Sequence, residues 1–145
     1  MTAEYLTVEH LSRHKLQLLF AKITVVSELY FNSTPCWIWG GSRNRKGYGQ
    51  TYWPGNRATK VHRLFFARFV HPLPMGQKYG ELDHLCKRPS CCNPTHLEFV
   101  PTRINVLRSG CPASRNANKT HCLNGHELIP EHLYKTKRRG RRCKV

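Results

Sequence analysis

The sequence has no apolar run that approaches the roughly 20 residues needed to cross a membrane. Its N-terminus, MTAEYLTVEH, also lacks the basic-then-apolar pattern of a secretory signal. We therefore expect a chain with no membrane partner that stays inside the cell. The expected location is the cytoplasm.

Acidic side chains are scarce, since 8 Asp and Glu stand against 24 Lys and Arg and give a formal net charge of +16. Residues 1–30 are balanced, whereas residues 101–145 hold eleven basic and two acidic side chains. Such an excess favours a polyanionic partner, most simply double-stranded DNA. A solvated basic surface, or association with ribosomes, would also account for the charge.

Paired cysteines are not indicated either. The chain has seven cysteines, and an odd number cannot pair fully within one chain. In a reducing compartment, cysteines at close spacing are more typical of metal ligands than of disulfides. Only 39% of the 145 residues are apolar. We expect one small domain, or one with an appendage, whose thin core is helped by metal.

The first half of the chain predicts a helical segment followed by strands. Residues 7–30 resemble a helix capped by Thr7, although the β-branched residues 23–26 weaken its second half. Residues 36–53 predict a β-hairpin, and a third strand follows at 57–61. The hairpin turn carries three basic residues that could face DNA, or simply solvent: Arg43, Arg45 and Lys46.

The centre of the chain predicts an amphipathic helix over 61–70 and then a strand, a loop, a strand and a helix. The strands are expected at 80–85 and 97–100, and the second helix at 102–108. The fold class is therefore α+β, a small mixed domain. We expect an N-terminal helical segment (1–35), a core (36–110) and a basic Cys/His tail (111–145).

Three residues of the core have the chemistry of a phosphodiesterase. The imidazole of His84 titrates near neutrality and could deprotonate water. Asp83 and Asn105 offer oxygen ligands for one Mg²⁺ or a similar divalent ion. Each of these residues alone means little, but the set with cysteines between its members predicts a metal-dependent nuclease.

The loop after His84 has the ligands of a structural zinc site. Cys86, Cys91 and His96 lie in a segment with too few apolar residues to fold alone. Cys36 would complete the set and connect the two halves of the core. Cys92 competes with Cys91 as the ligand, and buried free cysteines are the alternative to a metal site.

The tail has a second Cys/His cluster. Cys122 and His126 are four residues apart and could converge in a tight turn, with Cys111 and Cys143 as further ligands of a second zinc. His121 could replace Cys111. The alternative is a flexible basic tail. In either case four arginines are expected to contact DNA phosphates: Arg138, Arg139, Arg141 and Arg142.

The segment from residue 83 to 105, with the pattern D-H-L-C…C-x-N-P-x-H-L…N, resembles the HNH or ββα-metal endonucleases of phages and mobile introns. It is most similar to their zinc-bound branch, which includes the His-Cys box homing endonucleases. The preceding CWIWGG…GYG…VHRL is similar as well, so that the resemblance covers about residues 36–111. The middle Asn of the HNH name is replaced here by His96, which matches a zinc ligand of the His-Cys box.

The resemblance implies a role for each matched residue. His84 would be the general base, Asn105 with Asp83 would bind the catalytic ion, and Arg63 would lie near the scissile phosphate. Cys36, Cys86, Cys91 and His96 would hold the first zinc. The implied function is homing-like or restriction-like DNA cleavage, with a homodimer as one way to cut both strands. The alternative is a zinc-stabilised DNA-binding protein without catalysis.

Overall fold

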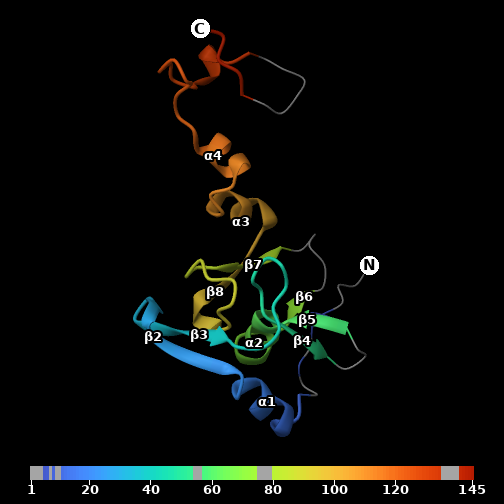
Figure 1. Cartoon of the computed structure of the whole chain (residues 1–145). Helices are drawn as coiled ribbons and strands as arrows, with labels where there is room; N and C mark the ends of the chain where they lie inside the picture. Colours follow the sequence, from blue (N-terminus) through green and yellow to red (C-terminus); the bar gives the residue numbers. More distant parts are fainter. Residues whose placement is uncertain (1–4, 7, 9–10, 54–56, 75–79, 135–140) are drawn as a thin grey trace. The chain divides into compact units, whose positions relative to one another are not determined.

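The computed structural model of the protein describes residues 5–6, 8, 11–53, 57–74, 80–134 and 141–145 (Figure 1). The chain divides into two compact units, Met1–Thr102 and Arg103–Val145. This division follows residue 102, and the boundaries that the sequence suggested after residues 35 and 110 stay predictions. Each unit is described by itself below.

The N-terminal segment is half helix and half strand. Helix α1 (Arg13–Phe20) begins after Ser12, whose hydroxyl accepts a hydrogen bond from the Lys15 backbone N–H at 3.2 Å. Strand β2 (Ile23–Phe31) follows, so the prediction of helix through residue 30 was wrong. The β-branched residues at its start favour a strand once a partner is present. Thr7, the predicted cap, lies outside the described residues.

The partner of β2 is β3 (Thr34–Trp39), with Val26 opposite Cys36 and Ile23 opposite Trp39. Strand β4 (Gln50–Trp53) pairs with β5 (Arg57–Lys60) in a separate sheet. The two strands of the hairpin predicted over residues 36–53 therefore pair with other strands instead of with each other, although an antiparallel bridge between Arg43 and Gly49 closes the predicted basic turn. The strand predicted after residue 57 was confirmed.

The segment between β3 and β4 packs against the buried Trp39 ring and is closed by an antiparallel bridge between Arg43 and Gly49. Trp39 is 1% exposed, and its Nε1–H donates to the Ser42 carbonyl at 3.0 Å. A Cβ atom at Gly41 or at Gly49 would lie 2.7 Å from this ring. Both positions therefore require glycine, and the segment wraps around the tryptophan.

Helix α2 (Val61–Phe69) is confirmed and forms the centre of the first unit. Its buried residues include Leu64 and Phe65, which belong to the same apolar core as Trp39. The short strands β1 (Tyr5–Leu6) and β6 (Leu73–Pro74) pair beside this core.

The predicted strand, loop and return strand are also confirmed. Strand β7 (Glu81–His84) pairs antiparallel with β8 (Leu97–Val100), and the 3₁₀ turn η2 (Pro94–His96) leads into β8. The molecule is thus a small mixed α and β protein with short antiparallel strands. Helix α3 (Thr102–Arg108) follows β8 as predicted. Its packing on the β7–β8 hairpin, which a ββα-metal motif requires, stays a prediction because the division between the units falls within it.

The second unit contains α3 from Arg103 onward, α4 (Pro112–Asn118) and the 3₁₀ turn η3 (Pro130–His132). Isolated bridges join His121 to Glu127 and Leu133 to Cys143. Helix α4 was not expected from the sequence. In the described parts of the chain, none of the helices combines the length and the apolar character needed to cross a membrane.

Candidate functional site

Four side chains from distant parts of the first unit form a buried Cys/His cluster. Cys36 comes from β3, Cys86 and Cys91 from the loop after β7, and His96 from η2. One ligand atom from each lies within 4.8 Å of the others, and all four residues are buried. The cluster has the donor set and the proximity that allow it to hold a metal ion, as the sequence predicted.

Backbone hydrogen bonds between the loop and β3 create this arrangement. Trp39 donates its N–H to the Ser90 carbonyl, and Cys92 donates to the Trp37 carbonyl, both at 2.9 Å. An antiparallel bridge between Ile38 and Cys91 lies between them. The loop therefore runs along β3 like a short additional strand, which brings its sulfur atoms to Cys36.

The structure separates the two adjacent thiols that the sequence left open. The Cys91 sulfur lies 3.5 Å from Nδ1 of His96 within the cluster. The Cys92 sulfur donates instead to the Trp37 carbonyl at 3.3 Å and packs in the apolar core. Alternation along an extended segment sends consecutive side chains to opposite sides, so only Cys91 joins the cluster.

A hydroxyl outside the cluster orients His96. Thr34 Oγ1 donates to the Phe31 carbonyl at 3.0 Å, so its lone pair accepts from His96 Nε2–H at 2.8 Å. The remaining nitrogen, Nδ1, then carries its lone pair toward Cys36 and Cys91, each 3.5 Å away. Histidine ligands of metals are commonly oriented by such a partner on the other ring nitrogen.

The cysteine thiols of the cluster shift the pKa values of one another. A hydrogen bond from the Cys91 thiol lowers the pKa of Cys86 to about 4. The same contact, together with burial, raises the pKa of Cys91. Burial is the main reason that the pKa of Cys36 is raised, and repulsion from Cys86 adds to it. Three buried thiolates therefore cannot coexist without a cation to offset their charge.

The imidazole of His84 lies at the end of β7, beside this loop. It is 6% exposed, and its Nε2 lies 3.0 Å from the Cys91 carbonyl. A carbonyl only accepts, so Nε2 carries the proton and Nδ1 carries the lone pair. Burial lowers the pKa of His84, which keeps the ring neutral near pH 7. The backbone of a cluster residue thus fixes the orientation and the tautomer of the His84 ring.

Asp83, one residue earlier, is also buried, at 5% exposure. The Lys87 ammonium lies 3.3 Å from one of its carboxylate oxygens and 3.4 Å from the other. The Asp83 carboxylate is therefore paired with a cation of the protein itself. Its predicted role as an oxygen ligand of a divalent ion stays a prediction.

A second buried histidine, His62, which the sequence reasoning did not place at the site, lies beside His84. The His62 ring centroid lies 4.6 Å from that of His84, and Tyr48 packs against both rings. His62 Nδ1 is buried without a hydrogen-bond partner among the described residues. Burial lowers the pKa of His62 well below its ordinary value, and His84 adds to the effect. The sequence, VHRL, gave only an apolar helix face as a signal.

The basic residues of the first unit that were predicted to contact DNA or phosphate differ in their contacts with the rest of the protein. Arg63, on α2, donates to the Pro74 carbonyl at 3.2 Å and is partly buried. Arg43 donates from Nε to the Trp39 carbonyl at 3.0 Å. Arg45 and Lys46 are exposed in the turn between β3 and β4. Contact of these residues with DNA stays a prediction.

Asn105 lies on α3 in the second unit and is partly exposed. Its predicted convergence with Asp83 and His84 stays a prediction, because the two units are described separately. The structure does bring Asp83 and His84 together with the cysteine loop, all within the first unit.

A second, smaller cluster lies in the second unit. Cys122, His126 and Cys143 place one ligand atom each within 4.8 Å of one another, and all are partly exposed. Cys111, the predicted fourth member, lies outside this group: its sulfur accepts from the Ser114 N–H at 3.4 Å and caps α4. Cysteine at the residue before a Pro-initiated helix is used here as a cap, which removes it from the cluster.

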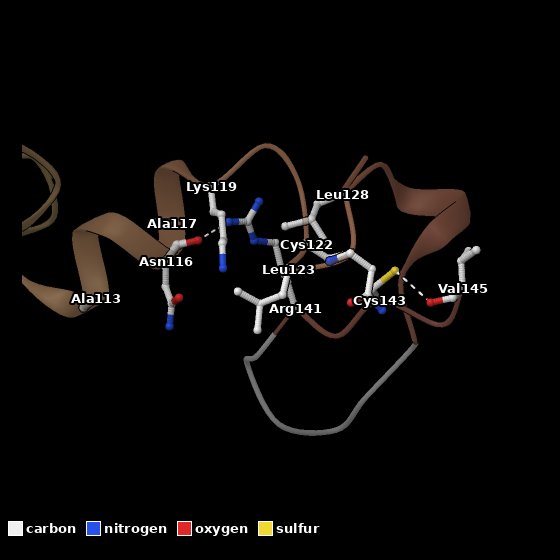
Figure 2. A pocket seen from close by; sticks show the side chains of 11 residues that line it. Ala113, Asn116, Ala117, Lys119, Cys122, Leu123, Leu128, Arg141, Cys143 and Val145 are labelled. Carbon is white, nitrogen blue, oxygen red and sulfur yellow. Dashed lines mark hydrogen bonds between the residues drawn. The ribbon is translucent and has the colours of Figure 1, made fainter. Parts of the chain in front are cut away.

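A pocket of about 670 Å³ adjoins this second cluster. Figure 2 shows Cys122 and Cys143 on one side of it and Asn116 with Lys119 on the other. The Arg141 guanidinium lies between them and donates to the Asn116 carbonyl. Arg141 and Arg142 are exposed, whereas Arg138 and Arg139 lie outside the described residues.

Comparison with known proteins identifies relatives of this chain. It is 36% identical over 107 residues to Protein 2.8 of Escherichia phage T7, across 74% of this chain and 67% of the relative. The chain belongs to the Protein 2.8 family. A second phage relative is the uncharacterized gene 5.3 protein of Enterobacteria phage T3, at 31% identity over 70 residues, 46% of this chain and 68% of the relative. Neither of these two names states an activity. No family model and no solved structure matches the chain.

Proposed function

We propose that this member of the Protein 2.8 family is a metal-dependent DNA endonuclease that hydrolyses phosphodiester bonds. The observation that carries the proposal is the hydrogen bond from His84 Nε2 to the Cys91 carbonyl. It joins a buried, neutral imidazole to the loop that the Cys/His cluster closes. A base held in this way by a metal-stabilised loop fits the HNH resemblance of the sequence.

Zn²⁺ is the ion proposed for the cluster in the first unit. Three sulfur atoms and one imidazole nitrogen are a common set for a closed, four-coordinate structural zinc. The zinc has a positional role here, because the loop it closes carries the carbonyl that orients His84. A second zinc is proposed at Cys122, His126 and Cys143.

The proposed reaction uses the residues at the end of β7. His84 Nδ1 takes a proton from the attacking water while Nε2–H stays on the Cys91 carbonyl. Asp83 and Asn105 would hold one Mg²⁺ or similar ion, which supplies charge stabilisation at the phosphate. Arg63 on α2 would add a positive charge near the same phosphate. The net charge of +16 supports DNA as the polyanionic substrate.

A plasmid-nicking assay tests this proposal. The zinc-loaded full chain is incubated with supercoiled plasmids and Mg²⁺, beside His84→Ala and a matched control, His14→Ala, on the exposed face of α1. Wild type and His14→Ala are expected to nick, and His84→Ala to be slower by about 10² or more. Equal rates for His84→Ala and wild type would refute the assignment of the base.

The rival function is a zinc-stabilised DNA-binding protein without catalysis. The exposed basic turn of the first unit, with Arg45 and Lys46, favours DNA binding on its own. Such a protein would bind DNA without nicking any plasmid, and His84→Ala would leave the affinity unchanged. Target sites from the phage that encodes the chain belong in the assay, since specificity would come from base contacts.

A further inference from the structure

Lys87 occupies an unusual position in the loop after β7. Its φ angle is +56°, in the left-handed region that side chains other than glycine rarely adopt. Its backbone N–H donates to the His84 carbonyl at 2.9 Å, which closes a tight turn directly after β7. The turn directs the Lys87 side chain back over the strand, so that its ammonium reaches Asp83.

The two side chains of the Asp83–Lys87 ion pair differ in exposure. The Asp83 side chain is 7% exposed, whereas the Lys87 side chain is 56% exposed. A buried carboxylate needs a compensating cation, but the flexible lysine stem can leave without exposing apolar core. Two neighbours fix the turn itself: Cys86 belongs to the buried cluster, and the Arg88 guanidinium donates to the Cys86 carbonyl at 3.1 Å.

We propose that Lys87 is the counter-ion of Asp83 in the metal-free protein, competes there with the catalytic divalent ion, and contacts the scissile phosphate once that ion is bound. This inference rests on the proposed nuclease function. A divalent ion and an ammonium at one carboxylate repel each other, since like charges about 4 Å apart interact strongly at a partly buried site. The displaced ammonium remains tethered to the loop beside His84, where the phosphodiester would lie.

Lys87 would therefore have opposite effects on two measurable quantities. It weakens binding of the ion to Asp83, because the ion must displace it. It speeds cleavage, because its charge-assisted hydrogen bonds stabilise the phosphate in the transition state. A purely structural lysine would not separate these two effects.

The test measures Mn²⁺ affinity and cleavage separately. Mn²⁺ binding to the zinc-loaded full chain is followed by electron paramagnetic resonance for wild type, Lys87→Ala and Lys87→Arg. We expect Lys87→Ala to bind Mn²⁺ up to about fivefold more tightly and, at saturating Mn²⁺, to nick plasmid about tenfold more slowly. Lys87→Arg keeps the charge and is expected to bind Mn²⁺ like wild type.

Further variants and measurements show whether Lys87→Ala changes the fold, and whether its effect on Mn²⁺ binding depends on Asp83. Alanine and lysine tolerate a positive φ about equally poorly, so Lys87→Ala should keep the fold and the zinc content. In an Asp83→Asn background, Lys87→Ala should no longer change Mn²⁺ affinity. Unchanged or weaker Mn²⁺ binding by Lys87→Ala overturns the competition, and an unchanged nicking rate at saturating Mn²⁺ overturns the phosphate contact. If wild type never nicks DNA yet Lys87→Ala binds Mn²⁺ more tightly, the nuclease proposal fails while the competition stands.

Discussion

The two Cys/His clusters of this protein differ in burial and in the sequence distance that they bridge. In the first unit, Cys36 lies sixty residues from His96, and all four members are buried. In the second unit, Cys122, His126 and Cys143 fall within a short stretch and are partly exposed. A buried cluster of distant residues holds a fold together, whereas an exposed cluster of near residues organises a local segment. His84, the proposed base, lies beside the first cluster, and we expect the first cluster to control activity.

The largest expected effect is that of breaking the first cluster. Cys91→Ser should abolish one zinc equivalent and lower the free energy of unfolding of the first unit by more than about 4 kcal/mol, as loss of a structural metal does. Cys122→Ser should remove a different zinc equivalent and leave the first unit folded. Metal analysis and thermal unfolding measure both.

Cys92→Ala is the matched control for Cys91→Ser, because it changes the adjacent thiol. Its sulfur contacts the Trp37 carbonyl and lies outside the cluster. The variant should keep all bound zinc. Loss of zinc in Cys92→Ala with retention in Cys91→Ser would reverse the assignment of the two thiols.

A smaller effect is expected from the hydroxyl that orients His96. Thr34→Val removes the acceptor of His96 Nε2–H without changing the side-chain shape. The zinc affinity of the first cluster should fall by about tenfold, as measured by competition with a chelator. Thr120→Val removes a hydroxyl beside His121, outside the second cluster, and should change no zinc affinity. Equal affinities for Thr34→Val and wild type would show that Thr34 does not orient the ligand.

Acidification should destabilise the first unit through His62. Burial lowers the pKa of His62 well below 6.5, so below that pH the unfolded chain takes up a proton that the folded chain does not. The free energy of unfolding should then fall with decreasing pH, by up to about 1.4 kcal/mol per pH unit from this residue. Above pH 6.5, the contribution of His62 to the free energy of unfolding should no longer depend on pH.

Urea unfolding at several pH values, for wild type and His62→Gln, checks this linkage. Between pH 6.5 and 5.5, the free energy of unfolding of His62→Gln should depend less steeply on pH than that of wild type, because the wild-type imidazole opposes folding there. His84, whose pKa is also lowered, would account for a remaining slope. Identical slopes for the two proteins would contradict a buried neutral His62.

The smallest effect is expected from single exposed arginines. Arg45→Ala in the first unit and Arg141→Ala in the second should each weaken DNA binding a few-fold and reduce the salt dependence of log K by about 0.9 if each contacts one phosphate. Arg13→Ala on α1, in the charge-balanced N-terminal segment, is the control and should change neither. Fluorescence anisotropy across a salt series measures the DNA affinity of the three variants. If only the variant in one unit binds DNA more weakly, that unit carries the DNA contact.

The sequence predicted the strands and the loop around Asp83 because they are local and patterned. Residues 81–84 and 97–100 are two short segments that flank a run of soft ligands, so β7, β8 and the cluster members were foreseeable. The pairing of β2 with β3 was not foreseeable, since the helical pattern that ends near residue 23 was extended through residue 30, although the β-branched residues 23–26 favour a strand once a partner is present. His62 was missed because its burial depends on packing against His84 and Tyr48.

The cysteines of the second unit could also be assigned only in part from the sequence. Cys122 and His126 were predicted from their spacing, and the structure brings Cys143 to them. Cys111 was assigned to that cluster because any free cysteine in the tail could have served. Helix α4 begins at Pro112, so the cysteine before it caps the helix. Spacing alone does not distinguish a cap from a ligand.

The measurement that tests the central claim most directly is the plasmid-nicking rate of zinc-loaded wild type and His84→Ala with Mg²⁺. The account predicts nicking by wild type and a loss of about 10² or more in His84→Ala, with the zinc content unchanged. DNA binding by a folded, zinc-loaded wild type that never nicks its plasmids, or equal nicking by both proteins, would contradict it.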